Sequence, residues 1–300
     1  MTTHISIPKL DERGLSYEDL YNVILVMFKH ELPLLSQYHN PTSVDDIDSY
    51  ILCNTQRIFR TACTLQTIIN SEKDYITASA VLRMLADSLA TLYLIYQEEN
   101  EDILKLRHYL YVIDGLITRL RYMSRDIQYD HKIKKEEYDA IYEQYMNSKR
   151  DYEAARTLCV NKIKSCNLYK GHAAMVDKLI ECGNWKFKNL NSFKMKDNKY
   201  SWSEMYKKLT PFTKGDNFSF LSDYIHGLST SNLIIEEDEI VFEPIYSMAL
   251  SLLGLLSKLI HTRFESELNM IKPYMINALL DEQMPKQYFD YLIQQYNNTH

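Results

Sequence analysis

The chain has 300 residues and a formal net charge of −6, from 40 acidic and 34 basic residues. A chain of this length can bury a core large enough to fold without disulfides or metal ions, and its charge balance argues against a general affinity for nucleic acids or anionic membranes. It contains only 7 glycines and 7 prolines, which favours long helices with short connections.

The sequence favours a soluble protein of the cytoplasm. Its 5 cysteines form no CxxC pair, which is typical of reduced thiols, and no metal ligand spacing or cofactor motif is evident. Residues 1–15 are expected to form a polar arm without the apolar stretch of a secretory signal. The apolar stretches 84–96 and 245–256 are shorter than the roughly 18–20 residues of a membrane span, so no membrane partner is expected.

The first half of the chain is predicted to be helical. Ser16 and Asp19 form a capping pattern at the start of the first helix, and Ser43 and Asp46 repeat that pattern at the second. Asn100 is the expected cap of a later helix. The predicted ranges are 16–37, 43–70, 72–99, 101–129 and 134–166.

The second half is predicted to be helical with one irregular segment and one hairpin. Gly183 is expected to end a helix over 170–182, and residues 183–214 show no clean period. Apolar residues flank an acidic turn over 233–242, a pattern typical of a β-hairpin. The other predicted helices cover 217–230, 244–271 after Pro244, a helix headed by Pro273, and 286–296. The expected fold is all-α, a single helical domain over 1–300 with one minor hairpin.

Two of the predicted helices place polar residues four apart where a core would favour apolar ones. Arg83 and Asp87 share a face of one helix, and Ser222 and His226 share a face of another. Buried polar groups must be paired, so the two helices are expected to face each other. One interpretation is an acid–base or phosphate-binding site; the other is a structural network that fixes the helix register. A hydrolase that uses Ser222 is a weaker alternative because no GxSxG motif is present.

The segment 183–214 is a second candidate site. It contains eight lysines against two acidic residues and therefore has a net charge of +6, with aromatic residues between the lysines. Such a combination suits RNA or single-stranded DNA, because lysines contact phosphates and rings stack on bases. The alternative is a surface loop that its aromatic residues pin to the body of the protein. The residues of this candidate are Lys186, Lys188, Lys194, Lys196 and Trp202.

Two segments resemble a known family. Residues 80–96 (AVLRMLADSLATLYLIY) and 218–229 (FSFLSDYIHGLS), followed by a hairpin and an apolar helix, resemble an uncharacterised bacterial all-helical family of HEPN-like type. In that family a helix with an arginine and then an acid packs near a helix with Ser or Tyr followed by His-Gly. The resemblance implies a bacterial helical protein, dimeric in some members and often encoded at defence or toxin loci.

HEPN ribonucleases use an arginine that is followed after a short interval by a histidine. Arg125 and His131 have that spacing, whereas the helix of His226 has Ser222 where the arginine is expected. The leading hypothesis is therefore a cytoplasmic bacterial HEPN-like protein that acts by binding in a phage-defence or stress system. One alternative is a metal-independent ribonuclease. Another is an interaction protein that forms a homodimer, with the helix over 245–256 as its seam.

Overall fold

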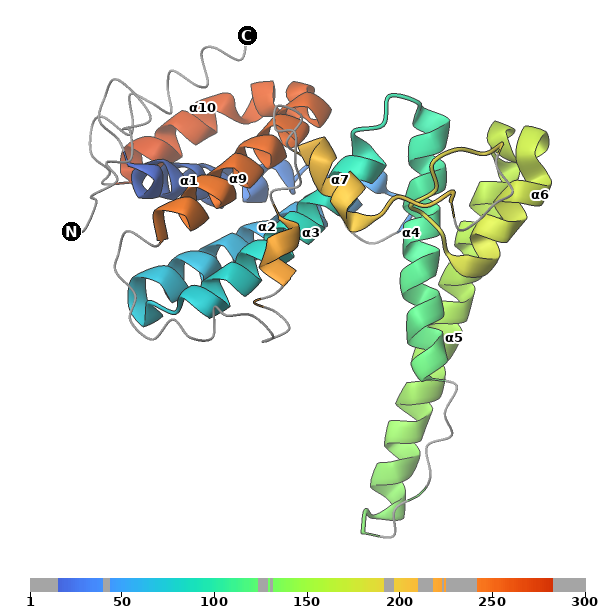
Figure 1. Cartoon of the computed structure of the whole chain (residues 1–300). Helices are drawn as coiled ribbons and strands as arrows, with labels where there is room; N and C mark the ends of the chain where they lie inside the picture. Colours follow the sequence, from blue (N-terminus) through green and yellow to red (C-terminus); the bar gives the residue numbers. More distant parts are fainter. Residues whose placement is uncertain are drawn as a thin grey trace. The chain divides into compact units, whose positions relative to one another are not determined.

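The computed structural model describes residues 16–39, 44–123, 129, 132–191, 197–209, 218–222, 224 and 242–282. All regular secondary structure in these ranges is helical, which confirms the all-α prediction. The predicted hairpin over 233–242 and the predicted helix over 286–296 lie outside them, except for Phe242. The chain forms two compact units, which we call unit 1 (Met1–Thr91 and Trp202–His300) and unit 2 (Leu92–Ser201) (Figure 1). That the chain is one domain stays a prediction.

Helix α1 (Tyr17–Leu35) opens unit 1 with the predicted cap. The backbone N–H of Asp19 donates to Ser16 Oγ at 3.1 Å, and the backbone N–H of Ser16 donates to Asp19 Oδ2 at 2.9 Å. This reciprocal pair satisfies two N–H groups that the helix itself leaves without acceptors. Helix α1 contacts α2, α9 and α10, so it lies at the centre of unit 1.

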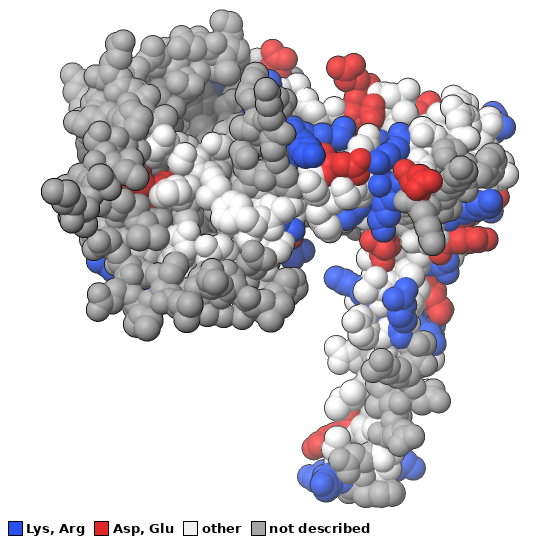
Figure 2. All heavy atoms as spheres, in the orientation of Figure 1, with Lys and Arg blue, Asp and Glu red and all other residues white. Residues whose placement is uncertain are grey.

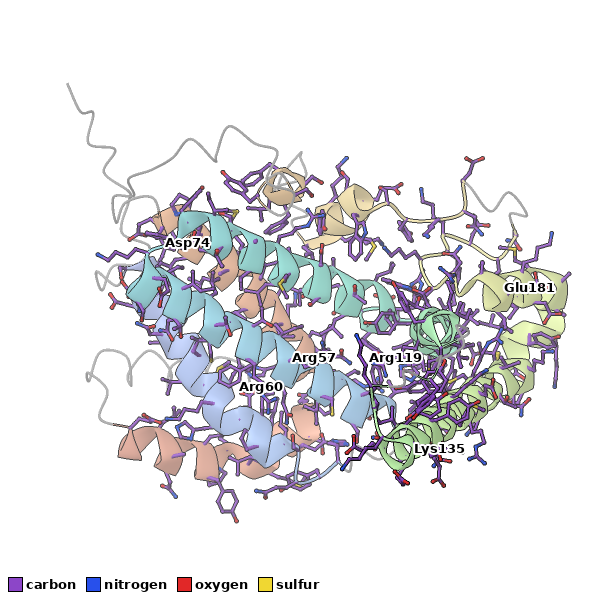
Figure 3. The ribbon with its side chains drawn as sticks, turned by 90° about the horizontal axis from the view of Figure 1, so that it is seen from below. Arg57, Arg60, Asp74, Arg119, Lys135 and Glu181 are labelled. Atoms are coloured by element: carbon purple, nitrogen blue, oxygen red, sulfur yellow. The ribbon has the colours of Figure 1, made fainter. Side chains whose placement is uncertain are left out.

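Helix α2 (Ile47–Thr67) starts later than predicted and ends in an unusual turn. Asp46 caps it by accepting the N–H of Ser49 at 3.0 Å, whereas the predicted cap Ser43 lies outside the described residues. A π turn (Ile68–Glu72) extends the helix, and Lys73 then adopts a left-handed conformation with φ of 51°. Helix α3 (Tyr75–Tyr96) follows alongside α2, with Asp74 at its start (Figure 3).

The last part of unit 1 corrects the predicted helix over 244–271. Helix α9 (Glu243–Arg263) begins with Pro244 in its first turn as predicted. It ends earlier than predicted, because Phe264 leaves the helical conformation with φ of −114°. Helix α10 (Glu265–Asp281) then includes Pro273 in its interior instead of starting there. The break was not predicted because apolar residues continue across it, and the buried ring of Phe264 anchors the new direction.

Two long apolar helices, α3 and α9, meet a length and composition criterion for membrane spans. By length and composition alone α3 and α9 could each cross a membrane, and 72% of the apolar window of α3 and 44% of that of α9 are buried. A core helix of a globular protein gives the same signal. The buried side chains of unit 1 include Phe28, Leu32, Leu35, Ile51, Leu65, Leu82, Leu252 and Leu256.

Unit 2 is built on a helical hairpin, α4 (Glu101–Tyr122) and α5 (Lys135–Ser165), which run side by side in Figure 1. Asn100 caps α4 as predicted, because its Oδ1 accepts the N–H groups of Asp102 and Ile103. Helix α4 ends at Tyr122, earlier than the predicted 129. Helix α6 (Asn167–Cys182) contacts both helices of the hairpin.

A seven-residue repeat on α5 includes two tyrosines that contact the C-terminal end of α4, since Tyr152 contacts Arg119 and Tyr145 contacts Met123. Tyr138, Tyr145, Tyr152 and Cys159 recur at this interval, which is the spacing of paired helices. Tyr145 donates its hydroxyl hydrogen bond to the carbonyl of Met123, which lies at the end of α4. The hydroxyl of Tyr145 therefore satisfies a carbonyl at the end of α4, and the ring of Tyr152 lies against the guanidinium of Arg119.

Candidate functional site

Arg83 and Asp87, the first half of the predicted cluster, form an ion pair on α3. The Nε atom of Arg83 lies 3.2 Å from Asp87 Oδ1, and Nη1 donates to the carbonyl of Phe218 at 2.8 Å. The guanidinium carbon lies 4.5 Å from the ring centroid of Tyr206. Arg83 is only 8% exposed, so its charge is compensated inside unit 1 by a carboxylate, a carbonyl and an aromatic face.

Tyr206 is the member of this cluster that the sequence did not reveal. It lies on α7 (Trp202–Leu209), in a segment predicted to be mostly irregular; for residues 202–209 that prediction is wrong. Its hydroxyl donates to Asp87 Oδ1, and its ring lies 5.9 Å from that of Phe218. Asp87 thus accepts from both Arg83 and Tyr206, and the cluster joins α3 to α7 and to the turn Ser219–Leu221.

The second half of the predicted cluster is described only in part. Ser222 is half-buried at the end of the turn Ser219–Leu221, while His226 lies outside the described residues, as do Arg125 and His131. The described structure thus brings Arg83 and Asp87 together with the backbone of Phe218, four residues before Ser222.

Unit 2 contains a second buried arginine with the same kinds of partner, and sequence reasoning missed it. Arg107 on α4 is 5% exposed. Its Nη1 donates to the carbonyl of Leu94 at 3.0 Å and to Glu98 Oε2 at 2.6 Å, and its Nη2 donates to the carbonyl of Phe187 at 3.4 Å. The guanidinium also lies 5.1 Å from the centroid of the Phe187 ring. It stands in the sequence DILKLRHYL, whose several charges made this part of the helix look exposed.

In the segment 183–214, the rings of Trp185 and Phe187 are buried in unit 2. Trp185 donates from Nε1 to Asp114 Oδ2 at 3.2 Å, and its ring lies 5.2 Å from that of Tyr111. Two of the rings expected to stack on bases therefore pack in the core. This matches the alternative in which aromatic residues pin the loop to the body.

Two lysines of this segment lie over aromatic rings of the loop itself. Lys186 Nζ is 5.0 Å from the centroid of Trp185, and Lys188 Nζ is 5.5 Å from that of Tyr200. Lys194 and Lys196 lie outside the described residues. On the face drawn in Figure 2, basic and acidic side chains lie interspersed over unit 2.

Trp202, the aromatic member of the predicted nucleic-acid site, lies at the start of α7 in unit 1. It is 37% exposed, and its ring stacks on that of Tyr206 with the centroids 6.0 Å apart. Trp202 therefore packs against Tyr206, a member of the Arg83 cluster.

A buried asparagine orders the described part of the loop. Asn198 Oδ1 accepts the backbone N–H groups of Lys188 at 3.0 Å and Asn189 at 2.9 Å, and Asn198 Nδ2 donates to the carbonyl of Asn189 at 2.7 Å. One side chain therefore satisfies three backbone groups, and it fixes the two ends of the loop against each other.

Unit 1 also contains a cavity of about 410 Å³ that the sequence did not predict. We call it the unit 1 cavity. It lies where the start of α1, the π turn after α2 and the start of α9 meet. No sequence pattern marks a π turn, so the convergence of these three segments could not be inferred. Its lining residues are Glu18, Ile69, Asn70, Lys73, Phe242, Glu243 and Tyr246.

Hydrogen bonds and charge define the chemistry of the unit 1 cavity. Tyr246 donates its hydroxyl hydrogen bond to Asn70 Oδ1 at 2.7 Å. Burial, together with the charge and hydrogen bond of Glu18, raises the pKa of the Tyr246 phenol. Burial and the negative charges of Glu18 and Asp19 raise the pKa of the Glu243 carboxyl. The cavity wall is therefore acidic, and its two glutamates repel each other.

Within the described ranges, no group of three or more His, Cys, Asp or Glu side chains is placed to hold a metal ion. Comparisons with protein-family models, with curated proteins and with solved structures found no match to this chain.

Proposed function

We propose that the protein acts by binding and not by catalysis, as a cytoplasmic bacterial protein of HEPN-like type in a phage-defence or stress system. The resemblance of residues 80–96 and 218–229 supports the family and its setting. The geometry around Arg83 supports the choice of binding over catalysis.

The observation behind this choice is that Arg83 is already engaged by its own chain. A catalytic arginine in phosphoryl transfer must direct N–H groups at the phosphate in the transition state. The guanidinium of Arg83 is buried, and its Nη1 and Nε atoms are directed at the Phe218 carbonyl and the Asp87 carboxylate. To turn these two N–H groups toward a phosphate, Arg83 would have to release the Phe218 carbonyl and break its ion pair with Asp87, which would keep only the hydrogen bond from the Tyr206 hydroxyl.

The structure also bears on how a homodimer would form. Leu252 and Leu256, at the centre of the proposed seam, are buried in the core of unit 1. A charged substitution at either position would therefore destabilise unit 1 whether or not the protein forms a dimer. A homodimer seam on this helix would use its exposed face, which includes Ser251 and Gly254.

The experiment that tests this proposal incubates the full-length protein with total RNA and with single-stranded DNA in EDTA. Wild type, His226→Ala and His131→Ala are compared for cleavage and for binding, with His172→Ala as the control on α6. We expect intact nucleic acid with all four proteins. Cleavage by wild type that is lost in His226→Ala or His131→Ala, with an unchanged circular dichroism spectrum, would make the protein a ribonuclease and overturn the proposal.

A further inference from the structure

We propose that the unit 1 cavity binds a small organic monocation, a primary amine on a short hydrocarbon body, whose ammonium group lies between Glu18 and Glu243. This inference rests on the proposed function in binding, and it names the chemistry of one ligand.

The backbone around the unit 1 cavity takes an unusual course that exposes polar groups to its interior. A π turn, which is rare and frequent at functional sites, directs Ile69 and Asn70 to the cavity. The left-handed conformation of Lys73, unusual for a residue with a side chain, then reverses the chain into α3. The volume of about 410 Å³ lies within the range of small-molecule sites.

The charges of the cavity wall select a monocation. Among the described lining residues, Glu18 and Glu243 contribute two negative charges and Lys73 one positive charge, so this part of the wall has a net charge of −1 when it is ionised. Glu18 and Glu243 line the same cavity, and burial first, then the negative charges of Glu18 and Asp19, raise the pKa of Glu243, so the two carboxylates repel each other when both are ionised. An ammonium group between them removes that repulsion and forms charge-assisted hydrogen bonds.

The other wall residues favour an organic cation over a metal ion. Ile69, Phe242 and Tyr246 are largely buried and give the cavity an apolar side that a hydrated ion would not use. The Tyr246 hydroxyl interacts with Asn70 and with Glu18, and its oxygen lone pairs can accept an N–H from the ligand. A body of roughly ten heavy atoms fits a cavity of this size.

The test uses calorimetric titration of the full-length protein with phenethylamine and isopentylamine. The matched control ligand is 3-phenylpropionate, which has a similar body and the opposite charge. We expect one amine molecule per chain and no binding of the carboxylate. Glu243→Gln should weaken amine binding about tenfold or more, since it removes a charge-assisted hydrogen bond.

A matched variant separates this loss from a general effect on helix ends. Glu243 and Glu265 are the first residues of α9 and α10, so Glu265→Gln removes the same interaction with a helix N-terminus outside the cavity. It should leave the affinity unchanged. Lys73→Asn keeps a residue that tolerates the left-handed backbone and removes the positive charge, so it should tighten amine binding.

The pH dependence of amine affinity distinguishes a Glu243 that binds the ligand from a Glu243 with a structural role alone. Because the pKa of Glu243 is raised and the ammonium favours its ionised form, affinity should increase as pH rises through that pKa, with release of a proton on binding. Equal binding of 3-phenylpropionate, an equal loss in Glu265→Gln, or no binding of either amine at millimolar concentration would overturn the inference. In those cases intact RNA in the cleavage assay would leave the proposed function standing.

Discussion

In the described part of the chain, unit 1 and unit 2 each bury one arginine side chain, and the two arginines have the same three kinds of partner. Arg83 binds a carboxylate four residues away, a distant carbonyl and an aromatic ring; Arg107 binds a carboxylate nine residues away, two carbonyls and an aromatic ring. Of the two, only Arg83 was singled out from the sequence as a candidate site residue. Because the same arrangement recurs in unit 2, it is best explained as a device that joins chain segments.

The two arrangements differ in one additional hydrogen bond. In unit 1 the hydroxyl of Tyr206 donates to the carboxylate that pairs with Arg83. In unit 2 a second backbone carbonyl, that of Phe187, accepts from Arg107. Arg83 therefore fixes a side-chain network between helices, whereas Arg107 fixes the backbone of the loop after Gly183.

The largest expected effect is the loss of either arginine. Arg83→Met and Arg107→Met should each lower the free energy of unfolding by about 3 kcal/mol, because each breaks an ion pair and removes the arginine donor of a backbone carbonyl. The two tryptophans separate the units, since Trp185 lies in unit 2 and Trp202 in unit 1. Urea unfolding followed by fluorescence in Trp202→Phe and Trp185→Phe backgrounds measures each unit.

The comparison predicts that each substitution acts on its own unit. Arg83→Met should lower the midpoint reported by Trp202, and Arg107→Met the one reported by Trp185. If Arg83→Met left the stability unchanged, Arg83 would not have the structural role assigned to it.

A backbone substitution in unit 2 should have the next largest effect. Gly183 has φ of +61°, and a Cβ there would lie 2.8 Å from the Cα of Asp114. Gly183→Ala should therefore cost about 2 kcal/mol in unfolding free energy, from a left-handed backbone and a clash with main chain. Gly115→Ala is the matched control in α4, where a Cβ meets nothing within 4 Å. It should stabilise unit 2 slightly, so a loss of the same size in both variants would contradict this account.

Removing the Tyr206 hydroxyl tests how much its hydrogen bond to Asp87 stabilises unit 1. Tyr206→Phe keeps the ring over Arg83 and deletes the hydrogen bond to Asp87. We expect a loss of about 1 kcal/mol in unit 1, as for one hydrogen bond to a charged group that keeps another partner. Tyr122→Phe, at an exposed tyrosine of unit 2, should change nothing measurable in urea unfolding.

The smallest expected effect is a pH dependence confined to unit 1. His261 Nε2 lies 3.2 Å from Oε2 of the fully buried Glu31. Burial lowers the pKa of His261, but the hydrogen bond and charge of Glu31 raise it more, so the net shift is upward. A raised histidine pKa stabilises the fold fully below the unfolded value of about 6.5 and loses that contribution as pH rises through the folded value.

Unit 1 should therefore unfold at lower urea concentration as pH rises from about 6 to above the folded pKa of His261. His261→Gln should remove that slope. A slope of the same size in His261→Gln would assign it to other groups.

Local signals in the sequence were sufficient for several helix ends. Ser16 with Asp19, Asn100 and Gly183 were predicted as caps or terminators, and the structure confirms each. These predictions succeeded because each depends on hydrogen bonds or dihedral angles within a few residues.

Features set by distant contacts could not be predicted. The turn at Phe264 has no breaker residue, and Pro273 lies in a helix interior where the sequence suggests a start. For the candidate site, the sequence indicated Arg83 and Asp87 but not Tyr206, which comes from a segment without periodicity and 119 residues away. The unit 1 cavity depends on three segments that only tertiary packing brings together.

The most direct test of the central claim, that Arg83 holds the fold and does not act on a substrate, is an RNA incubation in EDTA with wild type and Arg83→Lys. Lysine retains a positive charge near Asp87 but loses the planar fork that a phosphate would need. The account predicts intact RNA with both proteins and a lower urea midpoint for unit 1 in the variant. RNA cleaved by wild type and spared by a folded Arg83→Lys would contradict it.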